Sequence, residues 1–205
     1  MLTRLKEKVQ KMLTAEAKAA HKIGLTPNVI SGLGMLLAFA SAWAYTQWQI
    51  DKTYLVFATV LLLFSGFCDA LDGVLARLYQ SATAFGGFLD SLLDRYADAM
   101  AYAGVILGGL CDVFWGLAAL VGALLVSYSR ARAEAAGIKM ETVGFAERAE
   151  RMLILAITSV TAFIWQQETK TIMNTGIISL AVLSNMTVLQ RSLHVYAKTR
   201  NEGKS

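Results

Sequence analysis

Hydrophobic residues gather in six long stretches that are separated by short polar segments. The stretches cover about residues 28–48, 53–75, 86–110, 113–129, 152–165 and 171–195. A helix needs about 20 mostly apolar residues to cross the hydrocarbon core of a bilayer. Backbone polar groups in lipid must find partners within their own segment, which favours helices. The pattern predicts an all-α polytopic membrane protein with six transmembrane helices. Because the fifth stretch is short, we expect its helix to extend into residues 147–151.

The first 25 residues have a different pattern. The apolar residues of this leader recur at steps of three and four, at Leu2, Leu5, Val9, Met12 and Leu13. The same segment carries Arg4, Lys6, Lys8, Lys11, Lys18 and Lys22. Basic amphipathic helices of this kind bind anionic membrane surfaces. We therefore predict a juxtamembrane surface helix over residues 1–25 and one transmembrane domain over residues 26–205.

Composition supports the membrane interpretation, and the distribution of charge predicts the orientation. The chain is 56% hydrophobic and only 17% charged, whereas soluble domains carry about 25% charged residues. With six spans, the basic leader, Arg77, the segment 130–151 and the tail 198–204 all lie on one side of the membrane. Cytoplasmic loops carry the excess of Lys and Arg. We expect both termini in the cytoplasm and the protein in the plasma membrane.

Five aspartates in the second and third stretches form the clearest candidate for chemistry. Asp69 and Asp72 are three residues apart, and Asp90 and Asp94 are four apart, so each pair shares one face of a helix. Asp98 continues the second stripe by one turn, and the sequence gives it no role. Carboxylates in apolar helices are costly and usually mark a functional site. Four converging carboxylates repel one another unless cations lie between them, and Mg²⁺ combines carboxylates with substrate phosphates.

Three other interpretations of these carboxylates are considered. They could be ordinary helix-end groups that reach water, although four at this spacing beside Gly73 and Arg77 argue against that. A divalent-cation transporter would carry polar residues along several spans and near the midplane, whereas here they gather at one end. A non-catalytic scaffold would use the aspartates only for pairing helices.

The segment from residue 69 to 94 resembles the signature of the CDP-alcohol phosphotransferase family, D-x2-D-G-x2-A-R-x8-G-x3-D-x3-D. All eight fixed positions match, at Asp69, Asp72, Gly73, Ala76, Arg77, Gly86, Asp90 and Asp94. The resemblance implies a homodimer and two divalent cations, Mg²⁺ or Mn²⁺, bound by the four aspartates. It implies that Asp94 is the general base that deprotonates the acceptor alcohol. It also implies a CDP-lipid site at Asn28, Ser31, Asp69, Gly73, Ala76 and Arg77, where Ser31 replaces the family's usual threonine.

Two further segments resemble the members of this family that use inositol phosphate, the phosphatidylinositol phosphate and archaetidylinositol phosphate synthases. They are residues 127–134 and residues 147–151. The resemblance implies that the acceptor phosphate is bound by Ser127, Arg130, Arg148, Arg151 and Arg191. Arginines bind phosphate through a two-pronged fork, and Arg130 replaces the family's lysine, which changes that geometry.

The function implied is transfer of the lipid phosphate group from CDP-archaeol or CDP-diacylglycerol to inositol 1-phosphate, with release of CMP. The partners implied are therefore a CDP-lipid and a phosphorylated polyol, in a membrane and without nucleic acid. Glycerol 3-phosphate is the alternative acceptor, because it also carries a phosphate. Serine carries none and is disfavoured. The sequence leaves the ether or ester linkage of the lipid tails open.

Overall fold

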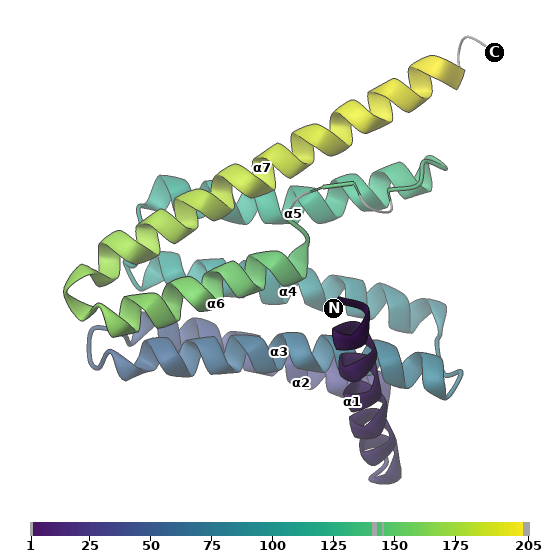
Figure 1. Ribbon diagram of the computed structural model, residues 1–205, viewed down its shortest axis with the longest axis horizontal. Coiled ribbons are helices and arrows are strands. Elements are labelled where there is room, and N and C mark those ends of the chain that lie inside the picture. Colours follow the sequence, from purple (N-terminus) through teal and green to yellow (C-terminus); the bar gives the residue numbers. More distant parts are fainter. Residues whose placement is uncertain (1, 141–142, 145, 203–205) are drawn as a thin grey trace.

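The computed structural model describes residues 2–140, 143–144 and 146–202, and within them all regular secondary structure is helical. The elements are α1 (Leu2–Lys22), α2 (Pro27–Thr46), α3 (Thr53–Leu78), α4 (Ala84–Leu107), α5 (Val113–Ala135), α6 (Arg148–Ile164), a 3₁₀ turn (Gln166–Glu168) and α7 (Thr169–Glu202). Helices α2 to α7 run alternately in opposite directions along the bundle (Figure 1). The predicted all-α class is confirmed.

Helices α2 and α4 begin at threonine caps. The Thr26 side chain accepts a hydrogen bond from the backbone N–H of Val29, and Pro27 occupies the first turn of α2. At the start of α4, Thr83 accepts from the backbone N–H of Gly86 at 2.9 Å. Because this cap fixes the first residue of α4, it also fixes which face of the helix carries Asp90 and Asp94.

Within the described part of the chain, four helices are long and apolar enough to cross a membrane: α2, α3, α5 and the segment that includes α7. Helix α6 has only 17 residues, although it begins at Arg148, which confirms its predicted extension. Helix α4 has 24 residues, but it carries the aspartates of the second stripe. Several membrane-crossing helices are therefore supported, and the full count of six remains a prediction.

The bundle is held together by small residues and by buried hydroxyl pairs. A Cβ added to Gly104 of α4 would lie 2.5 Å from the Cα of Ala42, so α2 and α4 approach each other closely. The hydroxyls of Tyr45 on α2 and Ser159 on α6 lie 2.8 Å apart and are buried. Helix α2 therefore packs closely against α4, and its Tyr45 hydroxyl reaches α6.

Helix α1 crosses the bundle steeply near the end where α3 finishes and α4 begins (Figure 1). Its Ala17 and Ala20 are buried in a cluster with Leu71 and Leu75 of α3. The leader is thus a helix, and it packs beside the acid-bearing part of α3. The side chains of residues 2–11 lie outside the described part of the chain, so the predicted apolar stripe is not tested there.

Candidate active site

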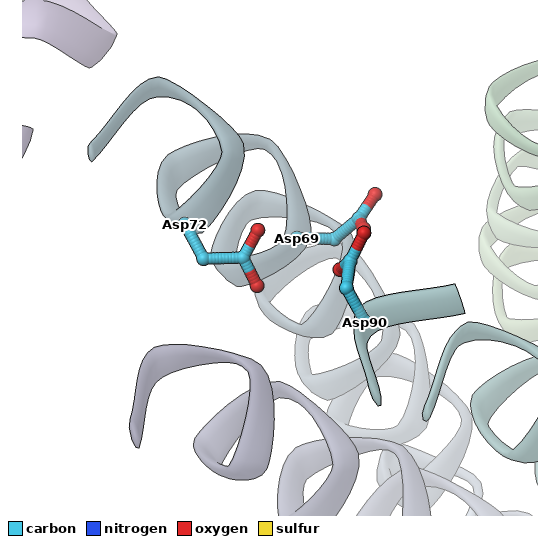
Figure 2. A group of neighbouring side chains, drawn as sticks. All are labelled: Asp69, Asp72 and Asp90. Carbon is cyan, nitrogen blue, oxygen red and sulfur yellow. The ribbon is translucent and has the colours of Figure 1, made fainter. Parts of the chain in front are cut away.

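Three aspartates converge between α3 and α4. Carboxylate oxygens of Asp69, Asp72 and Asp90 lie within 4.8 Å of one another. Figure 2 shows the three side chains leaving two helices and meeting in the same space. Hard divalent cations prefer carboxylate oxygens, so this donor set fits Mg²⁺ or Mn²⁺. The predicted convergence of these three residues is confirmed.

Asp94 joins this group through an arginine. The Nη1 atom of Arg148 lies 2.7 Å from Oδ1 of Asp94 and 2.6 Å from Oδ2 of Asp69. No well-aligned hydrogen bond is formed at Nη1, so the contact is chiefly electrostatic. A cavity of about 10 Å³ is lined by all four predicted metal ligands together with Arg148.

Ser31 is bonded to one of the aspartates. Its hydroxyl lies 2.5 Å from Oδ2 of Asp72 and 3.1 Å from the carbonyl of Pro27. A hydroxyl donates only one proton, and we assign it to the carboxylate because that contact is shorter and charged. Ser31 and Asp72 are both buried, which makes the bond an internal support for the carboxylate cluster.

A second cavity lies beside the aspartates, between α2 and the start of α4. It has a volume of about 120 Å³, and the predicted CDP-lipid residues that line it are Asn28, Ser31, Gly73 and Ala76. The other two predicted residues do not line it. Asp69 belongs to the group of three carboxylates. The Arg77 guanidinium lies 3.4 Å from a Cβ added to Gly73. A Cβ at Gly73 would therefore meet the arginine at an ordinary van der Waals distance.

A third cavity connects the aspartates with the predicted acceptor residues. Its volume is about 530 Å³. All five predicted acceptor residues line it: Ser127, Arg130, Arg148, Arg151 and Arg191. Asp69 and Asp94 line the same space, so the carboxylates and the basic side chains share one chamber.

Arg191 is bound mainly to backbone. It is only 2% exposed, and it donates from Nη1 to the carbonyl of Val126 and from Nε to the carbonyl of Val143. These bonds tie α7 to α5 and to the segment before α6. Its Nη2 lies 4.0 Å from Glu147. Two of its nitrogens are therefore already engaged, which the sequence did not show.

Sequence reasoning assigned no role to Asp98, although it lies in the centre of the site. Its carboxylate contacts Arg148 at 3.2 Å and Arg151 at 2.7 Å. The available signal was its position one turn beyond Asp94, on the same face of α4. Its partners lie 50 and 53 residues further along the chain.

Comparison with known proteins agrees with this geometry. Residues 24–190 match the family described as CDP-alcohol phosphatidyltransferase. The chain belongs to this family. It is therefore an enzyme of the phosphatidyltransferase type, and its all-helical membrane architecture is the setting for that activity.

The relatives of this phosphatidyltransferase include synthases of two inositol lipids. It is 40% identical to the archaetidylinositol phosphate synthase of Methanothermobacter thermautotrophicus, over 88% of each chain. It is 33% identical to the phosphatidylinositol phosphate synthase of Mycolicibacterium smegmatis, over 85% of this chain and 79% of that protein.

Solved structures of the Mycobacterium tuberculosis phosphatidylinositol phosphate synthase have the same fold. One, with CDP-diacylglycerol bound, has a TM-score of 0.78 at 29% identity and covers 91% of this chain and 94% of that one. Another, in complex with manganese and citrate, has a TM-score of 0.77 at 30% identity and covers 90% of this chain and 88% of that one.

Proposed function

We propose that this enzyme transfers the phosphatidyl or archaetidyl group from CDP-diacylglycerol or CDP-archaeol to inositol 1-phosphate and releases CMP. The observation that carries the proposal is the chamber of about 530 Å³ that contains both Asp94 and the five predicted phosphate-binding residues. A phosphorylated acceptor held by the arginines has its free hydroxyl beside the carboxylates. The names of the archaeal and mycobacterial relatives support inositol phosphate as the acceptor.

The four aspartates Asp69, Asp72, Asp90 and Asp94 hold divalent cations, Mg²⁺ or Mn²⁺. When bound, these cations supply positive charge that stabilises the diphosphate and the departing CMP. The carboxylate donor set supports this assignment, as does the manganese in the mycobacterial structure. In the proposed complex the cytidine diphosphate lies in the cavity beside Gly73.

Asp94 accepts the proton of the acceptor hydroxyl in this mechanism. The hydroxyl oxygen forms a bond to the phosphorus that carries the lipid, and the bond between that phosphorus and the CMP oxygen breaks. A carboxylate within hydrogen-bond reach of the hydroxyl can act as this base. Ser127, Arg130, Arg148, Arg151 and Arg191 hold the acceptor phosphate, which orients the hydroxyl for attack.

The proposed membrane arrangement has six spanning helices, with α1 on the cytoplasmic surface and residues 26–205 as one domain. Both termini and the active site lie on the cytoplasmic side of the plasma membrane. In support, the connection from α3 to α4, the end of α5 and the end of α7 all lie at one end of the bundle (Figure 1). Each of these helix ends is basic, with Arg77 in α3, Arg130 and Arg132 in α5, and Lys198 and Arg200 in α7. The family resemblance supports a homodimer.

An acceptor panel tests the proposed reaction. The purified enzyme is given CDP-archaeol or CDP-diacylglycerol, Mg²⁺ and one of four acceptors: inositol 1-phosphate, glycerol 3-phosphate, inositol or serine. We expect the fastest CMP release, and a phosphorylated inositol lipid by mass spectrometry, with inositol 1-phosphate. Faster turnover of glycerol 3-phosphate would show that it, and not inositol 1-phosphate, is the acceptor. Absence of metal-dependent CMP release with every acceptor would refute the proposed activity.

A further inference from the structure

Asp98 lies in the active-site chamber but outside the eight-position signature and outside the three-carboxylate group. Its side chain is only 10% exposed. A buried carboxylate is costly unless charged partners and hydrogen bonds compensate it. Here the compensation comes from two arginines that begin α6, so Asp98 links α4 to the acceptor side of the chamber.

Each carboxylate oxygen of Asp98 accepts from a different guanidinium. Oδ1 accepts from Nε of Arg148 at 3.2 Å, and Oδ2 accepts from Nη2 of Arg151 at 2.7 Å. Arg151 is 3% exposed, and its Nη1 donates to the carbonyl of Ala146 at 2.9 Å. Its Nε is buried and has no hydrogen-bond partner among the described residues. Asp98 and the carbonyl of Ala146 therefore hold two of the three nitrogens of this arginine, which lines the chamber.

Arg148 contacts carboxylates on two sides. Its Nη1 lies 2.6 Å and 2.7 Å from the carboxylates of Asp69 and Asp94, while Asp98 holds its Nε. Without Asp98, the attraction of the other two carboxylates would draw the guanidinium toward them and away from the acceptor side. Arg151 would lose the one carboxylate with which it forms an ion pair among the described residues.

We propose that Asp98 is a positioning residue for the acceptor: it holds Arg148 and Arg151 so that their remaining N–H groups bind the acceptor phosphate. This inference rests on the proposed function. Asp90, Asp94 and Asp98 then lie on one face of α4, on successive turns. Asp90 binds a cation, Asp94 acts as the base, and Asp98 holds the arginines that bind the acceptor. A four-residue step rises about 6 Å along a helix, so α4 itself sets the spacing between the base and the phosphate anchor.

The direction in which acceptor affinity changes in Asp98→Asn distinguishes a positioning role from a purely electrostatic one. Asp98→Asn removes a negative charge near the site of an anionic acceptor. If the carboxylate contributed only its charge, this change would strengthen phosphate binding. A positioning role predicts the opposite, because a misplacement of about 1 Å can lower activity about a hundredfold.

The experiment measures equilibrium binding of radiolabelled inositol 1-phosphate, together with KM for the acceptor and for the CDP-lipid. For Asp98→Asn we expect the Kd and KM of the acceptor to rise about 10- to 100-fold, as for loss of the groups that orient a ligand-binding side chain. The KM of the CDP-lipid should stay within about twofold of wild type, since the donor cavity does not include Asp98. The matched control is Asp112→Asn at the opposite end of α4, where asparagine still caps α5.

An unchanged or tighter acceptor Kd in Asp98→Asn would overturn the proposal, as would an equal rise in both KM values. If Asp98→Asn does not yield folded protein, Asp98→Glu provides the test, because it keeps the charge but displaces both arginines by a methylene. It should raise the acceptor KM several-fold and leave the donor KM unchanged; an unchanged acceptor KM would overturn the proposal. If the wild-type enzyme prefers another phosphorylated acceptor, the proposed substrate is wrong, and the same comparison made with that acceptor decides the role of Asp98.

Discussion

The bond from Ser31 to Asp72 provides the sharpest test of how the carboxylate cluster is held. Replacing Ser31 with alanine removes the donor that lies 2.5 Å from Oδ2 of Asp72 and leaves a buried carboxylate oxygen without it. A hydrogen bond to a charged group contributes about 1.5–3 kcal/mol. A carboxylate has about four acceptor positions, so the serine does not compete with a cation for Asp72. Its loss therefore disorders a metal ligand without freeing a new coordination position.

We expect the enzyme to need more Mg²⁺ for the same activity. With about 1.4 kcal/mol per factor of ten, the Mg²⁺ concentration for half-maximal CMP release should rise about 10- to 100-fold in Ser31→Ala. The assay is a Mg²⁺ titration of CMP release at saturating substrates, repeated as direct Mn²⁺ binding by electron paramagnetic resonance. Ser31→Thr is the matched control, because it keeps the hydroxyl and should retain the wild-type Mg²⁺ dependence.

Ser31 also lines the cavity proposed for the CDP-lipid, so the two roles must be separated. If Ser31→Ala leaves the Mg²⁺ and Mn²⁺ titrations unchanged and raises only the KM of the CDP-lipid, the hydroxyl serves the donor. That result would refute the assignment of Ser31 as a support for Asp72.

Three further substitutions test the base, the helix packing and the central arginine, and Gly32→Ala is the control for the packing test. Asp94→Asn should lower CMP release at least about a hundredfold while equilibrium binding of the CDP-lipid persists, because a neutral amide cannot accept the hydroxyl proton. Gly104→Ala should destabilise the protein by about 1–3 kcal/mol in thermal unfolding, since its Cβ would lie 2.5 Å from the backbone of Ala42. Gly32→Ala, with nothing within 4 Å, should leave stability unchanged or raise it by up to about 1 kcal/mol. Arg148→Lys should raise both the Mg²⁺ concentration for half-maximal activity and the KM of the acceptor. A rise in only one of the two would contradict the shared position of this residue.

The sequence predicted the helices well but misjudged where some of them end. Residues 113–129 were expected to form the fourth apolar helix, whereas α5 continues to Ala135. Likewise α7 continues to Glu202, beyond the apolar stretch that ends near residue 195. Hydropathy marks the part of a helix that suits lipid, whereas backbone hydrogen bonds continue into charged turns that are rich in good helix formers.

The site was predictable where its chemistry depends on spacing within one helix. Steps of three and four residues place Asp69 with Asp72, and Asp90 with Asp94, on single faces. The partners of Ser31 and Asp98 lie 41 and about 50 residues away, on other helices. Periodicity cannot supply such pairings, because they depend on how α2 lies against α3 and how α4 lies relative to α6.

Arg148 explains why the two halves of this site should respond together. One guanidinium lies within 3.2 Å of carboxylates of Asp69, Asp94 and Asp98, which we propose as a metal ligand, the base and the support of the acceptor arginines. A lysine ammonium is a point charge and cannot span these three groups in the way that a planar fork does. Ser31→Ala should therefore act mainly on the metal dependence and Asp98→Asn mainly on acceptor binding, whereas Arg148→Lys should change both to a similar extent. That contrast follows from the position of one side chain, and it makes Arg148 the residue at which binding of the cation and binding of the acceptor are coupled.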